Sequence, residues 1–324
     1  MRNKIDLSIV IVSWNVRDLL RQCLQSIVEQ ATRSTDQPTL WRLETGHTFQ
    51  VIVIDSASSD GSAAMAQAEF PGVRVYASKS NLGYAGGNNL GLSHSRGRYI
   101  LLLNPDTRVL HGALSVLIDY MDDHPTVGVS GPQLLYPDGS IQSSRRRFPT
   151  LGTALIESTF LQQWFPHHHL LNRYYVLDQP NDTICNVDWV IGACILVRKA
   201  VVDQVGALDD GYFMYSEELD WQKRIRAAGW QVSYVPAAQV IHYEGKSSEQ
   251  VMAFRHIRFQ KSKIRYFAKH HGPASGALLR AWLLFHYAYL WSIEMLKWLV
   301  GHKRDLRRER MRVYAQTLQS GLKP

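Results

Sequence analysis

Two apolar stretches decide the fold class: residues 7–13 read LSIVIVS, and residues 50–55 read QVIVID. Both are continuous and rich in β-branched side chains, which is typical of strands buried on both faces of a sheet. Between them, residues 16–30 repeat apolar side chains at helical spacing. This order of strand, helix and strand is typical of neighbouring strands that run parallel.

The same alternation continues along the first half of the chain and becomes less regular in the second. Such alternation predicts the α/β class, with a doubly wound, mostly parallel sheet flanked by helices. We expect a polar loop over residues 31–47. The other expected elements are helices at 59–68, 84–95 and 217–228, and strands at 73–77, 98–103, 188–197, 232–235 and 239–242.

Composition narrows the class of protein further. Hydrophobic residues make up 45% of the 324 residues and charged residues 20%, which excludes a wholly disordered chain. The three cysteines are far apart, so a disulfide framework and a CxxC zinc ribbon are excluded, and a reducing compartment is expected. The first apolar run is about eight residues long and no small-residue cleavage site follows it, so a buried strand fits better than a signal peptide.

Positive charge is concentrated at the C-terminal end of the sequence. Residues 251–324 hold 15 Lys and Arg against 3 Asp and Glu, whereas residues 1–250 hold 21 against 25. We therefore expect a slightly acidic body over residues 1–250 and a basic, Trp-rich helical tail over residues 251–324 that contacts one anionic surface. A helix is expected at 255–271, followed by a Gly-Pro break at 272–273.

The tail also contains an apolar stretch, residues 281–300, that has the length of a membrane span but includes His286, Glu294 and Lys297. Because charges at bilayer depth are costly, we expect an amphipathic helix in the headgroup region of an anionic membrane rather than a transmembrane helix. An ordinary helix packed on the body is the alternative. No nucleic-acid partner is expected, because no recognised binding signature accompanies the charge. Aromatic residues that suit the headgroup region are Trp282, Tyr287, Tyr289, Trp291 and Trp298.

In a parallel sheet, ligands bind where the strands end and the chain turns toward the helices. The first two predicted ends hold Ser13, Trp14, Asn15 and Asp55. A carboxylate such as Asp55 can accept hydrogen bonds from a ribose hydroxyl or a base imide, or it can cap its own turn.

Two later segments contain residues suited to a diphosphate. Residues 80–91 read SNLGYAGGNNLG, whose glycines allow close backbone approach to a ligand. This segment is neither GxGxxG nor a Walker A sequence, which argues against a nicotinamide dehydrogenase and a P-loop ATPase. Residues 101–107 read LLLNPDT, where Asn104 and Asp106 offer oxygen ligands for a divalent cation or form a structural turn. His242 could complete a metal site or serve as a structural hydrogen-bonding group.

Three acids crowd the first turn of the helix expected at residues 217–228: Glu217, Glu218 and Asp220. The helix dipole stabilises acids there, so an ordinary acidic N-terminus is one interpretation. The other is a general base that is held on a rigid element and takes a proton from an acceptor hydroxyl.

The order of these motifs decides between the interpretations. IVIVSWN, VIVIDSASSDGS, NLGYAGGNN, LLLNPDT, GACILVRK, FMYSEELDWQKRIRAAGW and VIHYEG together resemble the family 2 glycosyltransferases with a GT-A fold. The closest likeness is to the bacterial rhamnosyltransferase-like branch. It extends from about residue 7 to residue 245.

The resemblance implies a role for each candidate residue. Glu218 would be the catalytic base, with Asp220 as a rival or positioning residue, and Asp106 with His242 would bind Mg²⁺ or Mn²⁺. Asn104 stands where the family's metal motif has its first Asp, and Glu218 stands where Asp is usual. The nucleotide sugar would be held by Ser13, Trp14, Asn15, Asp55, Asn81, Gly83, Asn89 and Asn104, with Trp189, Gly192 and Ala193 lining the donor-sugar and acceptor pocket.

The implied activity is an inverting, metal-dependent sugar transfer in bacterial cell-surface polysaccharide synthesis. The expected donor is dTDP-rhamnose and the expected acceptor is a glycan or a polyprenyl-diphosphate-linked sugar. A UDP-hexose or UDP-galactofuranose donor is an alternative, as is a catalytically silent sugar-nucleotide-binding scaffold. The expected location is cytoplasmic, at the inner face of the plasma membrane, and a homo-oligomer is left open.

Overall fold

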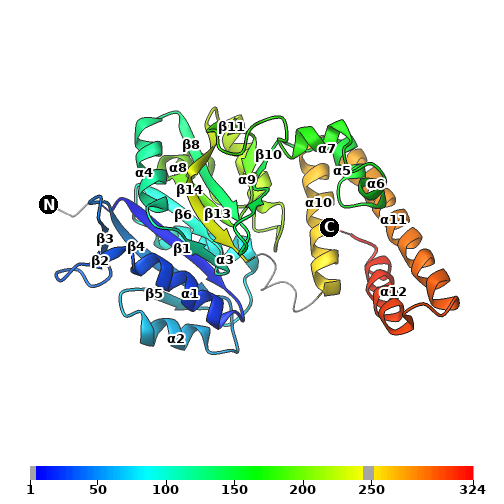
Figure 1. Cartoon of the computed structure of the whole chain (residues 1–324), viewed down its shortest axis with the longest axis horizontal. Helices are drawn as coiled ribbons and strands as arrows, with labels where there is room; N and C mark the ends of the chain where they lie inside the picture. The colour runs from blue at the N-terminus through cyan, green and yellow to red at the C-terminus, as the bar shows by residue number, and fades with distance from the viewer. Residues whose placement is uncertain (1–4, 244–251, 324) are drawn as a thin grey trace. The chain divides into compact units, whose positions relative to one another are not determined.

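The computed structural model describes residues 5–243 and 252–323. The chain forms two compact units (Figure 1). Unit 1 combines the chain up to Phe148 with Tyr175–Phe213 and the segment that begins at Glu217. Unit 2 combines Pro149–Tyr174, Met214–Ser216 and the C-terminal helices. Each unit is described by itself below.

The parallel part of the sheet in unit 1 is built from the apolar stretches that the sequence marks. Strand β1 (Leu7–Ser13) lies between β4 (Thr48–Asp55) and β6 (Tyr99–Leu103) and is parallel to both, and β5 (Arg74–Ala77) is parallel to β4. Alternate residues of β1 face opposite cores: Ile9 and Ile11 face one, and Val10 faces the other. The predicted doubly wound α/β fold is confirmed.

Helices cover both faces of this sheet. The core on one face takes residues from α1 (Arg17–Val28), α2 (Ser62–Glu69) and α4 (Ala113–Asp123). The core on the other face takes residues from α3 (Gly83–His94), α8 (Lys199–Val205) and α9 (Glu217–Ala227). The strand ends are therefore bordered by the first turns of several helices, which is where a ligand site is expected.

The sheet as a whole is mixed rather than mostly parallel. Its order is β11-β14-β8-β13-β6-β1-β4-β3-β2, and β13 is antiparallel to both β6 and β8. A continuous apolar run predicts burial but carries no information on strand direction, which explains the difference. Beyond the parallel part described above, the main sheet also contains β7 (Thr107–Val109), β8 (Val127–Leu135), β9 (Ile141–Gln142), β11 (Cys185–Val187), β13 (Cys194–Arg198) and β14 (Gln231–His242). A separate two-stranded sheet pairs β10 (Arg145–Arg146) with β12 (Trp189–Val190).

Three expected elements differ in detail. Residues 31–47 contain β2 (Ala31–Arg33) and β3 (Trp41–Leu43), which extend the sheet beyond β4 where a loop was expected. The strand expected at 188–197 is interrupted between β12 and β13, and this break forms part of the candidate site. The two short strands expected at 232–235 and 239–242 are one strand, β14, whose register with β8 shifts between Val235 and Gln239.

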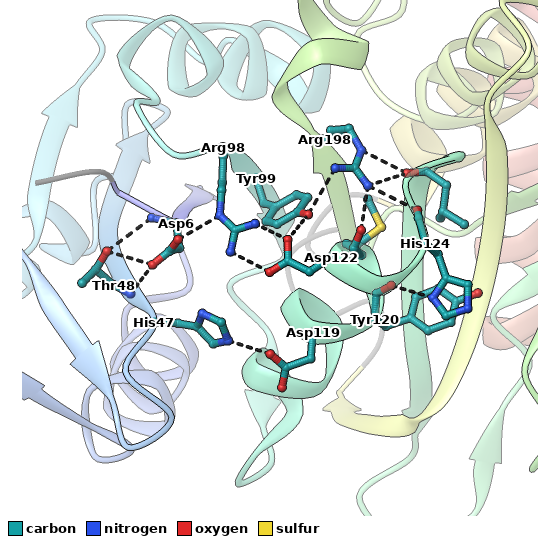
Figure 2. A network of polar contacts seen from close by, with 12 residues as sticks. Asp6, His47, Thr48, Arg98, Tyr99, Asp119, Tyr120, Asp122, His124 and Arg198 are labelled. Atoms are coloured by element: carbon teal, nitrogen blue, oxygen red, sulfur yellow. Dashed lines mark hydrogen bonds and ion pairs between the residues drawn. The ribbon is translucent and has the colours of Figure 1, made fainter.

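A polar network joins several elements at the N-terminal ends of the parallel strands, the end opposite the expected ligand site (Figure 2). Asp6 accepts hydrogen bonds from the Thr48 backbone N–H at 2.9 Å and from Arg98 Nε at 2.8 Å. Arg98 also pairs with Asp122 of α4, which accepts a further hydrogen bond from Tyr99 Oη at 2.7 Å. These contacts join the starts of β1, β4 and β6 to α4.

Unit 2 contains the tail helices that the sequence predicts: α10 (Met252–His271), α11 (Pro273–Leu299) and α12 (Arg304–Gln319) (Figure 1). It also contains three short helices that were not predicted: α5 (Leu151–Ile156), α6 (Phe160–Trp164) and α7 (His169–Tyr174). Within the described ranges, no helix is long and apolar enough to cross a membrane.

The short helices of unit 2 pack against the tail helices. The Lys263 ammonium of α10 forms an ion pair with Glu157 at 2.7 Å, and Trp282 Nε1 of α11 donates a hydrogen bond to the Leu155 carbonyl at 2.8 Å. Met214, which precedes α9, accepts a hydrogen bond from Ser262 Oγ at 2.8 Å. The tail is therefore part of a larger helical unit.

Candidate functional site

The ends of β1 and β4 place two buried polar side chains opposite each other. Ser13 and Asp55 are partners in the parallel register, and both are almost fully buried. Asp55 Oδ2 accepts a hydrogen bond from the Ser58 backbone N–H at 3.1 Å. Ser13 Oγ and Asp55 Oδ1 have no hydrogen-bond partner among the described residues. Buried polar atoms are rarely left unpaired, so these two atoms are suited to bind a ligand.

The neighbouring Asn15 holds the two strand-end loops together. Its backbone is in the left-handed region with φ of 53°, its N–H donates to Ser58 Oγ at 3.0 Å, and its Oδ1 accepts from the Ser59 N–H at 2.8 Å. Trp14 beside it is half-buried. Asn15 therefore shapes the loop that contains Asp55.

The glycines that follow β5 are explained by close packing within unit 1. Gly83 has φ of 68°, and a Cβ there would lie 2.2 Å from the Phe213 carbonyl oxygen. A Cβ at Gly87 would lie 2.6 Å from Val12 of β1. The Asn81 side chain accepts a hydrogen bond from the Gly83 N–H at 2.9 Å. These contacts press α3 against β1 and position the loop that contains Asn81.

The Asn89 amide is occupied by a backbone contact. Its Nδ2 donates to the Leu208 carbonyl at 2.9 Å, and its Oδ1 accepts from the Leu208 N–H at 3.0 Å. This reciprocal pair fixes the Leu208 backbone to α3. The structure therefore gives Asn89 a packing role.

The turn after β6 brings an acid and an imidazole together. Asp106 Oδ1 lies 3.5 Å from His242 Nε2, and both side chains are buried. His242 Nδ1 lies 2.9 Å from Gln142 Oε1, a carbonyl oxygen that can only accept a hydrogen bond. The tautomer that donates from Nδ1 to Gln142 leaves the Nε2 lone pair beside the carboxylate. This pair of electron donors fits a divalent cation, although the described part of the chain holds no cluster of three or more His, Cys, Asp or Glu residues.

The break between β12 and β13 links this turn to α9. The Asn104 N–H donates to the Ala193 carbonyl at 2.9 Å, and Tyr84 Oη donates to the Gly192 carbonyl at 2.6 Å. A Cβ at Gly192 would lie 3.0 Å from Tyr84 Oη and 3.6 Å from Glu218 Oε1. The chain thus gathers Asn104, Gly192 and Glu218 in one place.

Glu218 of α9 lies beside Gly192, in the break between β12 and β13. Its Oε2 is buried and has no hydrogen-bond partner among the residues that the structure describes. Burial raises the pKa of Glu218, and backbone N–H groups, including that of Gly192, oppose this rise. A carboxylate with a raised pKa and a free oxygen can accept a proton from a bound hydroxyl.

Asp220 lies in a different environment on the same helix. It is fully buried and pairs with Arg224 Nε at 3.0 Å. Arg224 in turn donates to the Val205 and Ala207 carbonyls, so this ion pair fixes α9 to the C-terminal end of α8 and the residues just after it.

Trp189, which was expected to line the sugar pocket, is buried, and its Nε1 donates to the Arg147 carbonyl at 3.1 Å.

Two residues that support the site were not predicted. Gln222 is fully buried, exchanges hydrogen bonds of 2.9 and 2.8 Å with the Val190 backbone, and so fixes α9 to β12. Gln142 orients His242. A glutamine on the buried stripe between Leu219 and Ile225 was a possible signal for Gln222, whereas the sequence around Gln142 has none.

The candidate acids Asp55, Asp106 and Glu218 all lie in unit 1, at strand ends or in the first turn of a helix. A family model described as "Glycosyl transferase family 2" matches residues 8–206. The chain belongs to this family, which confirms the resemblance seen in its sequence, and it is similar to rhamnosyltransferases.

Two relatives illustrate the similarity in sequence. The N-acetylglucosaminyl-diphospho-decaprenol L-rhamnosyltransferase of Mycobacterium tuberculosis is 31% identical over 253 residues, which cover 75% of this chain and 81% of the relative. The rhamnosyltransferase WbbL of Escherichia coli is 28% identical over 206 residues, which cover 60% of this chain and 73% of the relative.

Solved structures confirm the fold. The mannosyltransferase PcManGT from Pyrobaculum calidifontis, in complex with GDP-Man and Mn²⁺, matches with a TM-score of 0.54 and 16% identity, covering 99% of this chain and 87% of that one. GalNAc-T7 with UDP, GalNAc and Mn²⁺ matches with a TM-score of 0.55 and 14% identity, covering 82% of this chain and 48% of that one.

Proposed function

We propose that this glycosyltransferase transfers L-rhamnose from dTDP-rhamnose to a glycan or a polyprenyl-diphosphate-linked sugar in the synthesis of bacterial cell-surface polysaccharide. The names of the Mycobacterium tuberculosis and Escherichia coli relatives support the sugar, and the former supports a lipid-linked acceptor. A UDP-sugar donor is the alternative. A panel of nucleotide sugars distinguishes the two donors.

Ser13 and Asp55 are proposed to bind the nucleotide. The Asp55 carboxylate can accept a hydrogen bond from the base or from the ribose, and Ser13 Oγ can donate one. The observation that supports this role is that Asp55 Oδ1 and Ser13 Oγ are buried without partners among the described residues.

Asp106 and His242 are proposed to hold Mg²⁺ or Mn²⁺. Their donor set of one carboxylate and one imidazole leaves room for diphosphate oxygens, which such cations commonly take as ligands. Both solved neighbours named above contain Mn²⁺. When bound, the cation stabilises negative charge on the departing nucleoside diphosphate.

Glu218 is proposed to be the general base. Its Oε2 takes the proton of the acceptor hydroxyl while that oxygen forms a bond to the anomeric carbon. The bond between this carbon and the diphosphate oxygen breaks, and its electron pair leaves with the diphosphate. Attack from the face opposite the leaving group inverts the anomeric centre.

The observation that carries this proposal is the Glu218 carboxylate, whose Oε1 would lie 3.6 Å from a Cβ at Gly192 and whose buried Oε2 has no partner among the described residues. Glu218→Gln keeps the shape of the side chain and removes its basicity, so we expect turnover to fall by about 10²–10⁴-fold. Donor affinity, measured by calorimetry, should stay close to that of the wild type. Turnover near the wild-type level would remove Glu218 from this role.

Asp220→Asn is the matched variant because it changes the rival acid on the same helix. It weakens a buried ion pair with Arg224, so we expect a lower midpoint of thermal unfolding. The folded fraction should keep most of its turnover. A loss of turnover larger than that of Glu218→Gln would assign the base to Asp220 instead. A protein that neither transfers nor hydrolyses any donor would be a silent scaffold.

The tail is proposed to hold the enzyme at the inner, cytoplasmic face of the plasma membrane, where a lipid-linked acceptor would lie. Its excess of Lys and Arg supports this location, since anionic headgroups attract each basic residue near the surface with about 1 kcal/mol.

A further inference from the structure

The long helix α11 of unit 2 exposes an uncharged face. Leu278, Phe285, Leu296 and Leu299 are each more than half exposed, and Val300 directly after the helix is 86% exposed. The other exposed positions of the helix are Pro, Ala, Ser and Met residues, together with Lys297 near its end. A surface helix of a water-soluble protein normally shows the opposite pattern, with its charged side outward.

The polar groups of α11 are turned inward and are satisfied inside unit 2. Buried His286 accepts a hydrogen bond from the Phe160 N–H at 3.3 Å, and burial lowers the pKa of His286 to about 4, so the ring is uncharged at neutral pH. Buried Glu294 pairs with Arg307 of α12 at 2.7 Å. Unit 2 therefore neutralises the ionisable groups of α11 that would otherwise interrupt its apolar face.

Helix α6 adds aromatic side chains to the same face. Trp164 is 57% exposed, and its ring lies 5.0 Å from Phe160 and 6.2 Å from Tyr289. Phe160 lies 6.4 Å from the exposed Phe285. The apolar face, defined here as Trp164, Leu278, Phe285, Leu296, Leu299 and Val300, is thus held by packed aromatic rings and is larger than single exposed side chains require.

Cations border one end of this face. Lys297, Lys303, Arg304 and Arg308 are all exposed, and the Arg304 guanidinium lies 5.7 Å from the centre of the Trp298 ring of α11. This positive charge indicates what covers the apolar face. A second copy of the chain would bring its own cations to the interface, whereas anionic lipid headgroups neutralise them while acyl chains cover the apolar side chains.

We propose that the apolar face of unit 2 inserts into the boundary between headgroups and acyl chains of an anionic membrane, with α11 lying along the membrane plane. The purpose of this membrane contact rests on the proposed function, because the membrane is where the enzyme would reach a lipid-linked acceptor. The membrane contact as such is argued only from the apolar face and the cations beside it.

The test is binding of the full chain to vesicles of phosphatidylcholine with and without about one third phosphatidylglycerol, measured by sedimentation. The double variant Phe285→Ser, Leu296→Ser removes exposed apolar side chains only, so we expect binding to anionic vesicles to fall by at least about tenfold. The matched control, Leu177→Ser with Ile184→Ser, changes two exposed apolar residues of unit 1 and should bind like the wild type.

A second double variant, Lys303→Glu with Arg304→Glu, should weaken binding to anionic vesicles and leave the weak binding to phosphatidylcholine unchanged. Equal binding by the wild type and the Phe285→Ser, Leu296→Ser variant would overturn the proposal. So would a wild-type dimer in solution that this variant converts to a monomer, because the occupant would then be a second copy. Donor hydrolysis in solution tests the catalytic proposal separately, since the serine variant should keep it.

Discussion

Glu218 combines two properties that rarely occur together on a surface glutamate: a buried carboxylate oxygen without a partner and a pKa raised by burial. The first turn of α9 supplies the position, and the backbone of Gly192 supplies the hydrogen bond that limits the rise. The pair of acids at residues 217 and 218 was visible in the sequence. The contact with Gly192 was not, because 26 positions separate the two residues in the chain.

The raised pKa of Glu218 predicts how activity depends on pH. Only the ionised carboxylate can take a proton, so kcat/KM should fall as the pH falls through the raised pKa, at a higher pH than for an exposed glutamate with a pKa of about 4.3. A profile of kcat/KM against pH measures this limb. An acidic limb at or below the range of an ordinary glutamate would contradict the burial of the base.

The raised pKa of Glu218 also predicts that this residue lowers the stability of the folded protein at neutral pH, although it serves catalysis. A carboxyl whose pKa is raised by folding destabilises the folded protein increasingly as the pH rises above the unfolded pKa, and the full effect is reached above the folded pKa, where the buried group must be ionised. Glu218→Gln should therefore raise the midpoint of thermal unfolding at neutral pH while it lowers turnover. Below the pKa of an unfolded glutamate, about 4.3, both states are protonated, so the variant and the wild type should unfold at similar temperatures.

The helices and strands differ in how well they can be predicted from their sequences. Strands β1, β4 and β6 are short, continuous apolar runs, and such runs have few alternatives to a buried strand. Strands β2 and β3 have three residues each and a single buried side chain, Leu43, between them, so they are defined by the pairing of β2 with β3 and of β3 with β4. Helices α5 to α7 are also short, with five or six residues each, and packing in unit 2 stabilises them.

The residues of the candidate site also fall into those that local sequence predicts and those that depend on contacts between distant segments. Ser13, Asp55 and Asp106 lie at the ends of predictable strands, so their positions follow from sequence periodicity and the rule for parallel sheets. His242 reaches Asp106 only because β14 pairs with β7, a contact between segments more than 130 residues apart. Gln222 and Gln142 act through side-chain contacts that no local pattern predicts.

Gln222 allows a test of whether the position of α9 matters for catalysis. Gln222→Ala would leave the Val190 N–H and carbonyl unpaired in the core, at a cost of about 1–3 kcal/mol per group. We expect a lower free energy of unfolding in urea and a loss of turnover that exceeds any loss of donor affinity. Gln204→Ala is the control, because Gln204 accepts a hydrogen bond from Trp230 at the surface. Equal effects of both variants on turnover would argue against a positioning role.

The polar network at the start of the strands predicts how unit 1 responds to acid (Figure 2). Hydrogen bonds from Arg98 and Tyr99 lower the pKa of Asp122; burial raises the pKa of Asp6, but hydrogen bonds from Thr48 and Arg98 outweigh it. A lowered folded pKa stabilises above the unfolded value and loses this effect as the pH falls, here below about pH 5. Asp122→Asn should flatten this dependence in urea unfolding. An unchanged slope would show that the network contributes little, as surface ion pairs often do.

At the scale of the whole molecule, the division into two units changes how the tail can be studied. The simplest test of the tail would be to remove residues 278–324. In the structure, α11 packs on α6 and covers Phe160, so this deletion would expose part of the core of unit 2. Substitutions on the exposed face of α11 are therefore cleaner than truncation.

The residues of the proposed nucleotide and cation site, by contrast, all belong to unit 1, although they extend from Ser13 to His242. Because a ligand that binds only the folded state stabilises by about 2.7 kcal/mol at 100 times its Kd, a matching nucleotide should raise the unfolding midpoint by roughly 5–10 °C. We expect dTDP- or UDP-sugars with Mn²⁺ to give this shift and GDP-sugars to give less. Asp55→Asn should reduce the shift with or without metal, whereas Asp106→Asn should reduce only the part that depends on Mn²⁺. A larger shift with GDP-sugars would overturn the proposed donor, and a metal-dependent part that survives Asp106→Asn would remove Asp106 from the proposed cation site.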